Sequence, residues 1–71
     1  MKIGILGAGN IARNMANTLN AMDDAQFYAV GSRSMEKAEK FAKEYGAQKA
    51  YGSYEDLVSD PEVELVYVAT P

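Results

Sequence analysis

The sequence predicts an α/β protein with a parallel sheet. Three observations lead to this fold class: short apolar stretches alternate with amphipathic ones, a glycine-rich turn joins the first two, and residues 65–69 are apolar throughout. Alternating strands and helices favour a parallel sheet with right-handed crossovers. The expected order is β-α-β-α-β-α-β. A strand order of 3-2-1-4 would place the first two helices on one face and the third on the other.

The first half of the chain predicts a strand, a helix and a second strand. Residues 2–6 are apolar and β-prone, and a Gly-Ala-Gly turn follows them. A helix is expected over residues 10–22, because apolar side chains recur there every three or four positions. The buried stripe of this helix would consist of Ile11, Ala12, Met15, Ala16, Leu19 and Met22. Residues 26–31 (QFYAVG) then predict the second strand.

The second half continues the alternation. A helix is expected between Ser34, a favourable N-cap, and Gly46, which suits the left-handed end of a helix. The inner face of this helix would consist of Met35, Ala38, Phe41, Ala42 and Tyr45. Residues 48–51 predict a third strand, and residues 53–59 predict a short helix with capping-box spacing. The fully apolar residues 65–69 (LVYVA) are typical of a parallel strand buried on both faces.

Composition excludes several classes of function. A chain of 71 residues forms at most one small domain, and it contains neither cysteine nor histidine, so disulfides, thiolate metal sites and imidazole catalysis are excluded. The net charge of -3 argues against a nucleic-acid binder. No stretch approaches the roughly 18 apolar residues of a membrane span. We therefore expect a cytoplasmic domain that binds no membrane, no nucleic acid and no metal.

The segment GAGNIA (residues 7–12) matches the pattern G-x-G-x-x-A between a strand and a helix. Gly7 permits a tight turn, Gly9 lets a pyrophosphate approach the backbone, and Ala12 allows close packing of helix on strand. The free N–H groups near Asn10 and Ile11 would face the phosphates at the positive end of the helix dipole. The alternative is that the two glycines only form a turn.

The end of the second strand predicts which cofactor binds. An acidic residue about 20 positions beyond such a turn usually holds the adenosine ribose. Twenty positions beyond Ala12 the sequence has Ser32, and residues 25–35 contain no Asp or Glu. Arg33 could bind a 2′-phosphate with its planar guanidinium, Ser32 with its hydroxyl and Lys37 with its charge. We therefore expect NADP, with NAD as the alternative. In the competing interpretation Arg33 and Lys37 are merely solvated.

Three segments resemble a known family in order and spacing. KIGILGAGNIA, GSRSMEKAEKFAKEYG and YGSYEDLVSDPEVELVYVATP are similar to the amino-terminal part of the glucose-fructose oxidoreductase / inositol dehydrogenase / MocA family. The resemblance implies a Rossmann-type fold and an NAD(P)-dependent oxidoreductase that acts on sugars, cyclitols and related alcohols. It assigns cofactor contacts to the turn, to the end of the second strand and to the end of the fourth strand: Gly7, Ala8, Gly9, Asn10, Ile11, Ser32, Arg33, Lys37, Ala69, Thr70 and Pro71.

The resemblance also implies what the sequence lacks. Family members continue with a Glu-Lys-Pro motif, whose lysine contributes to catalysis, and with a large substrate domain. We therefore expect residues 1–71 to form the first part of a dinucleotide-binding domain, with no catalytic residue and no activity of its own. In a full-length parent, hydride would pass between the nicotinamide and a hydroxyl-bearing carbon of a sugar or cyclitol.

A second function, and the oligomeric state, remain open. The chain could be a non-catalytic nucleotide-binding or sensing module that uses the same turn. An S-adenosylmethionine-binding transferase is disfavoured, because an acidic residue usually holds the ribose in that class as well. Self-association through the exposed edges of the third and fourth strands would give a homo-oligomer.

Overall fold

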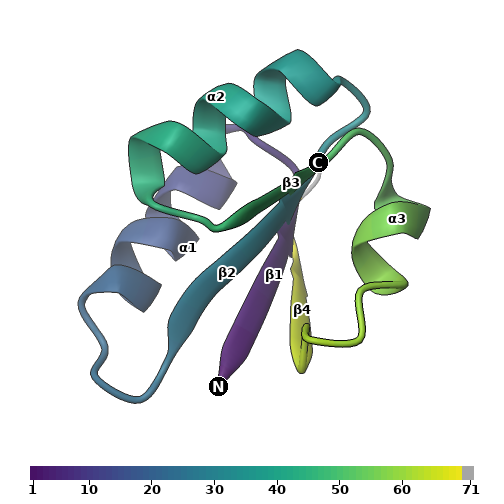
Figure 1. The fold of residues 1–71 in the computed structure, drawn as a ribbon. Coiled ribbons are helices and arrows are strands. Elements are labelled where there is room, and N and C mark those ends of the chain that lie inside the picture. Colours follow the sequence, from purple (N-terminus) through teal and green to yellow (C-terminus); the bar gives the residue numbers. More distant parts are fainter. Residues whose placement is uncertain (70–71) are drawn as a thin grey trace.

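The computed structural model describes residues 1–69 and contains seven helices and strands in this range (Figure 1). The strands are all parallel and lie in the order β3-β2-β1-β4, which confirms the predicted topology. Along the chain the elements are β1 (Lys2–Leu6), α1 (Asn10–Asn20), β2 (Gln26–Gly31), α2 (Met35–Tyr45), β3 (Lys49–Tyr51), α3 (Tyr54–Val58) and β4 (Leu65–Val68).

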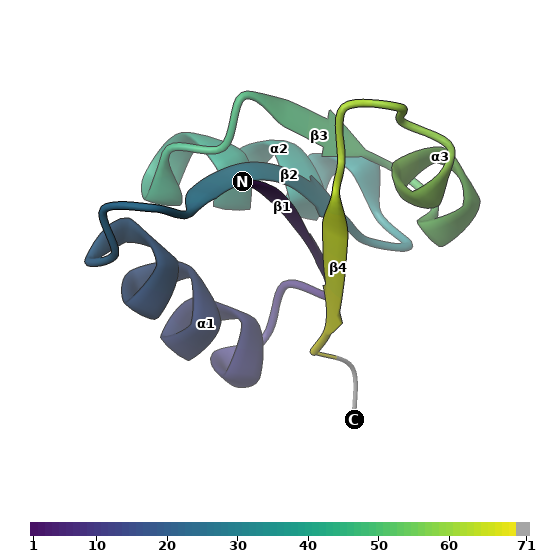
Figure 2. The same ribbon diagram turned by 90° about the horizontal axis from the view of Figure 1, so that it is seen from below.

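The helices cover both faces of the sheet, as predicted. Figures 1 and 2 show α1 and α2 on one side and the short α3 on the other. The larger core lies beneath α1 and α2, where Ile5 and Val30 of the strands are completely buried. On the opposite face, Leu57 of α3 is completely buried against Tyr28 and Ala29. Within residues 1–69, no helix has the length and apolar character needed to cross a membrane.

Local chemistry fixes the ends of α2 and α3. The hydroxyl of Ser34 accepts a hydrogen bond from the N–H of Lys37, and the hydroxyl of Ser53 accepts one from the N–H of Asp56. Gly46 ends α2 with a φ of 84°, a left-handed conformation that favours glycine. These three signals lie within one turn of the helix ends that they define, which is why the sequence predicted these ends well.

Three apolar residues expected in the core are exposed instead. Ile11, Met22 and Met35 are 55%, 45% and 48% exposed. Met22 lies beyond the end of α1, because this helix stops at Asn20 rather than continuing to residue 22. Ile11 and Met35 lie in the first turns of their helices, and Ala12, next to Ile11, is completely buried.

Strand β4 is also more exposed than expected. Leu65, Tyr67 and Val68 are 42%, 39% and 67% exposed, although a strand buried on both faces was predicted. In this structure β4 lies at an edge of the sheet and pairs only with β1. On the face covered by α3, that helix is only five residues long and packs mainly on β2, β3 and β1.

Two glycines make room for α3 to pack on the sheet. A Cβ atom added to Gly4 would lie 3.1 Å from Leu57 Cδ1, and one added to Gly31 would lie 3.0 Å from Leu57 Cβ. Both distances are shorter than ordinary carbon contacts of about 3.5–4.0 Å. Leu57 therefore fills a depression on β1 and β2 that exists because these two positions lack side chains. Glycine inside a strand often marks a close approach of this kind.

A register shift between β1 and β2 changes which side chains face α3. Ile3 pairs with Phe27, but the next residue, Gly4, pairs with Ala29, so Tyr28 is the extra residue of a bulge. Strict alternation would place Tyr28 and Ala29 on opposite faces of the sheet. The bulge places both of them against Leu57. Three side chains can therefore form the small second core even though α3 is short.

A side-chain hydrogen bond holds the loop after α3 against β3. The hydroxyl of Tyr51 donates to Oδ2 of Asp60 at 2.5 Å, which raises the pKa of Tyr51 to about 12, with burial as the next cause. The same bond lowers the pKa of Asp60, aided by the N–H of Glu62. The ionised Asp60 therefore stabilises the fold above its ordinary pKa of about 3.9. This contribution is lost as the pH falls through the lower pKa of the folded state.

In a Tyr51→Phe variant, we expect the pKa of Asp60 to rise toward its ordinary value, because the main hydrogen bond to the carboxylate is gone. An NMR titration of the Asp60 carboxyl carbon in both proteins measures this change. Tyr45→Phe is the control, because Tyr45 packs against Phe41 on the other face of the sheet. An unchanged midpoint in Tyr51→Phe would show that the hydrogen bond does not stabilise the charged carboxylate.

Candidate functional site

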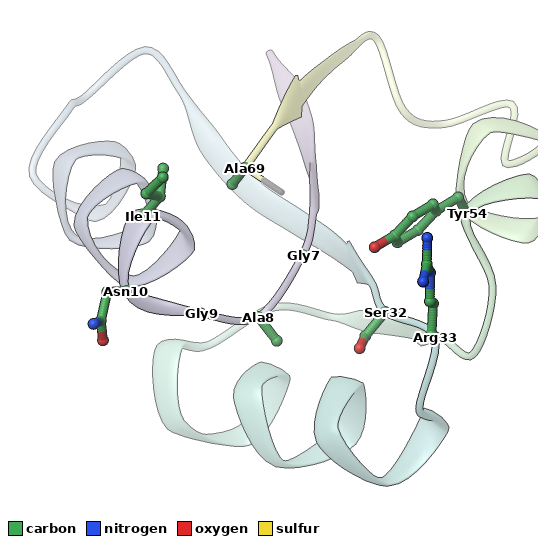
Figure 3. A pocket seen from close by; sticks show the side chains of 9 residues that line it. All are labelled: Gly7, Ala8, Gly9, Asn10, Ile11, Ser32, Arg33, Tyr54 and Ala69. Carbon is green, nitrogen blue, oxygen red and sulfur yellow. The ribbon is translucent and has the colours of Figure 1, made fainter. Parts of the chain in front are cut away.

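A cavity of about 500 Å³ opens at the carboxyl ends of the strands (Figure 3). Each of the four strands is followed by a segment that contributes to its lining. The turn after β1, the end of β2, the first residue of α3 after β3, and the residue after β4 supply Gly7, Ala8, Gly9, Asn10, Ile11, Ser32, Arg33, Tyr54 and Ala69. Ligands of open parallel sheets bind at this end, at the reversal of strand order that here lies between β1 and β4.

Backbone hydrogen bonds extend the sheet into the lining of the cavity. The N–H of Gly7 donates to the carbonyl of Gly31 at 2.7 Å, and the N–H of Ser32 donates to the carbonyl of Tyr51 at 3.0 Å. The N–H of Ala69 likewise donates to the carbonyl of Leu6 at 2.8 Å. The backbone of the segments after β1, β2 and β4 is therefore held by the neighbouring strands.

The two glycines of the turn have different physical roles. Gly7 has a φ of 113°, a conformation that side chains other than glycine rarely adopt, so the turn itself requires it. Gly9 has a φ of -97° and a ψ of -160°, which any residue can adopt. Among residues 1–69, and apart from its two chain neighbours, a Cβ atom added to Gly9 would meet no atom within 4 Å. The fold therefore does not require glycine at position 9, whereas close approach of a ligand to the backbone would.

Among the described residues, no side chain accepts a hydrogen bond from the free N–H groups at the N-terminus of α1. The first turn of this helix also contains no acidic residue. The other two helices are capped by serine and have acidic residues in their first turns. Within residues 1–69, the positive end of α1 therefore faces the cavity with no acidic side chain in its first turn, and a bound phosphate would be stabilised there.

Ser32 and Arg33 lie side by side on the opposite side of the cavity from α1 (Figure 3). Ser32 is only 8% exposed, and its oxygen accepts a hydrogen bond from the N–H of Ser34 at 3.3 Å. Within the described part of the chain its hydroxyl donates no hydrogen bond, so it can donate one to a ligand. Arg33 is exposed, and the cavity lining contains no Asp or Glu among the described residues. The geometry thus offers an anion one hydroxyl and one guanidinium group.

The structure does not bring every predicted site residue into this cavity. Lys37 lines a separate groove of about 180 Å³ between α1 and α2, together with Ala8, Arg13, Lys40, Phe41 and Glu44. Ala8 borders both spaces, so the two are neighbours. Lys37 therefore stands apart from Ser32 and Arg33. The predicted contacts Thr70 and Pro71 lie outside the described residues.

Tyr54 also lines the cavity, although the sequence analysis did not identify it as a site residue. Its ring lies beside the guanidinium group of Arg33, with 5.9 Å between Arg33 Cζ and the ring centroid. The sequence does contain a signal for this position, because Ser53 caps α3 and places the next residue at the start of a helix. Only the strand order, however, shows that this helix begins next to the end of β2.

Both a family model and a curated relative that match this chain are of oxidoreductases or dehydrogenases. The model of a family described as "Oxidoreductase family, NAD-binding Rossmann fold" matches residues 1–71. The mouse (Mus musculus) protein trans-1,2-dihydrobenzene-1,2-diol dehydrogenase is 42% identical over 72 residues, which cover 99% of this chain and 22% of that protein.

Two solved structures share the fold over the whole chain. An NAD binding oxidoreductase from Klebsiella pneumoniae superimposes with a TM-score of 0.92 at 33% identity, covering 100% of this chain and 21% of that one. KijD10, a 3-ketoreductase from Actinomadura kijaniata in complex with NADP, gives a TM-score of 0.93 at 28% identity, covering 100% of this chain and 23% of that one. The chain thus spans about a fifth of the length of these relatives.

Proposed function

Because this chain belongs to the oxidoreductase family with the NAD-binding Rossmann fold, we propose that it forms the cofactor-binding part of an oxidoreductase that prefers NADP. The observation that carries this proposal is the composition of the cavity at the ends of the strands. An uncapped helix and an open glycine turn lie on one side, and a serine–arginine pair lies on the other. The two sides suit the pyrophosphate and a phosphorylated ribose, respectively.

We assign the pyrophosphate to the turn that follows β1. Gly7, Ala8 and Gly9 would let the phosphates approach the backbone, and the N–H groups of Asn10 and Ile11 would donate hydrogen bonds to them. The open space beside Gly9 and the uncapped start of α1 support this assignment. The fit is electrostatic as well as steric, because the first turn of α1 contains no carboxylate that would repel phosphate.

We assign the 2′-phosphate of the adenosine ribose to Ser32 and Arg33. A guanidinium group binds phosphate through two parallel N–H donors, and a serine hydroxyl can add a third. Lys37, in the neighbouring groove, would contribute its positive charge from a greater distance. The KijD10 structure, which contains NADP, supports this choice of cofactor.

The nicotinamide would lie near the end of β4, where Ala69 lines the cavity. Thr70 and Pro71 are proposed to continue this surface. When bound, the nicotinamide supplies the chemistry of hydride transfer. We propose a hydroxyl-bearing carbon of a sugar or cyclitol as its partner, and the relatives named as dehydrogenases of a cyclic diol are consistent with this class. We assign no catalytic residue within residues 1–69, whose part is to bind and orient the cofactor.

The proposal predicts a selective effect of an Arg33→Ala substitution. NADPH binding should weaken by about 1.5–3 kcal/mol, as for the loss of a hydrogen bond to a charged group, while NADH binding stays nearly unchanged. Fluorescence titration of the purified protein with each cofactor measures the two affinities. Lys43→Ala removes the same charge from the far end of α2 and is the matched control. Equal losses for NADPH and NADH in Arg33→Ala would contradict the 2′-phosphate assignment.

A further inference from the structure

Tyr54 and Arg33 form a cation–π pair at the rim of the proposed cofactor site (Figure 3). The two side chains come from different elements, since Arg33 follows β2 and Tyr54 is the first residue of α3. Figure 3 shows the end of the Arg33 side chain against the ring of Tyr54, at one end of the cavity that both residues line. A guanidinium group over an aromatic face is attracted by the negative face of the ring.

The two members of this pair differ in how firmly the protein holds them. Tyr54 is half-buried and sits on a helix that is anchored three times: by the Ser53 cap, by the buried Leu57 and by the bond between Tyr51 and Asp60. Arg33 is exposed, and no ion pair of Arg33 is present among the described residues. The tyrosine ring is therefore the fixed surface, and the arginine is the side chain that it orients.

We propose that Tyr54 is a positioning residue that holds the guanidinium group of Arg33 in place for the ribose phosphate of the cofactor. The inference rests on the proposed function, because it assigns Tyr54 a role in that same site. A long arginine side chain loses conformational freedom when it binds phosphate. Contact with Tyr54 restricts the side chain before the ligand arrives, so less freedom is lost on binding. The face of the ring, and not its hydroxyl, supplies this effect.

A double-mutant cycle tests the inference. The variants are Tyr54→Leu, Arg33→Ala and the protein with both changes, and the affinity of each for NADPH and NADH is measured by fluorescence titration. We expect Tyr54→Leu to weaken NADPH binding about two- to fivefold, the scale of an exposed cation–π contact. In the Arg33→Ala background the same change should have no further effect. Tyr54→Phe, which keeps the ring, should bind NADPH like the natural chain.

Two controls separate positioning from a loss of structure. Tyr67→Leu makes the same change at an exposed tyrosine of β4 that lines a different groove, and it should leave both affinities unchanged. Thermal unfolding followed by circular dichroism shows whether each variant is folded. Should Tyr54→Leu fail to fold, Tyr54→Met keeps a long apolar side chain at this position, and the same comparison with Tyr54→Phe applies.

Each outcome separates this inference from the proposed function. Additive effects of Tyr54→Leu and Arg33→Ala would overturn the inference, because Tyr54 would then act independently of Arg33. A loss in Tyr54→Phe as large as that in Tyr54→Leu would also overturn it, since the hydroxyl would then be the active group. Equal coupling with NADPH and NADH would support the positioning role but contradict the 2′-phosphate assignment. Coupling between Tyr54 and Arg33 that is seen with NADPH and not with NADH supports both the positioning role and the 2′-phosphate assignment.

Discussion

A Gly9→Val variant is expected to keep its fold and to lose binding of both NADPH and NADH. Valine can adopt the backbone angles of Gly9, and within residues 1–69 its Cβ atom would meet no atom other than those of the adjoining residues. The same side chain would occupy the space that the pyrophosphate needs to reach the N–H groups of α1. Each hydrogen bond to a charged group contributes about 1.5–3 kcal/mol. Loss of two such bonds weakens binding more than about a hundredfold.

The Gly9→Val experiment combines two measurements on the same protein. Circular dichroism during heating reports the stability of the variant, and fluorescence titration reports its affinity for each cofactor. Gly46→Ala is the contrasting control, because Gly46 needs its left-handed conformation and lies outside the cavity lining. That change should cost about 1–2 kcal/mol of stability and leave binding intact. A folded Gly9→Val protein that still binds either cofactor would show that the turn is only structural.

Leu57→Ala is expected to have the largest effect on stability. Leu57 is completely buried in the depression formed at Gly4 and Gly31, and truncation would leave a cavity that the strand backbones cannot fill. Changes of this kind cost about 2–5 kcal/mol. A core of this size supplies no more than about 3–5 kcal/mol in total. A large fraction of the variant should therefore be unfolded at room temperature.

Urea or thermal unfolding followed by circular dichroism measures this loss. The neighbouring Val58→Ala is the matched control, since Val58 lies on the same helix and is 59% exposed. A surface change of that kind stays within about 0.5 kcal/mol. Similar losses of unfolding free energy in Leu57→Ala and Val58→Ala would mean that the packing of Leu57 on the sheet does not stabilise the fold.

The parts of the fold that the sequence predicted are those with local signals. Strand order and the ends of α2 follow from alternation, from Ser34 and from Gly46. The bulge at Tyr28 could not be predicted, because it depends on pairing with β1 rather than on the residues of β2. The exposure of Met22 was missed because the apolar periodicity continues to Met22, whereas α1 ends at Asn20 with Ala21 as its C-cap.

The candidate site was predicted where its residues directly follow strands. Gly7 to Ile11 and the pair Ser32 and Arg33 are placed by strand ends, so a count along the sequence found them. Lys37 depends on the direction in which the first turn of α2 presents its side chains, and that turn faces the neighbouring groove. Tyr54 enters the site from a third strand–helix connection, which no spacing between motifs indicates.

The backbone and the side chains of the candidate site differ in how firmly the fold holds them. The backbone N–H groups of Gly7 and Ser32 donate hydrogen bonds to neighbouring strands. The main chain at these two positions is therefore fixed by the hydrogen bonding of the sheet. The Arg33 side chain, by contrast, is exposed and can be exchanged with little effect on folding. If the proposed assignments are right, substitutions at Arg33 would change the preference between NADP and NAD, while binding of the pyrophosphate common to both cofactors would stay the same.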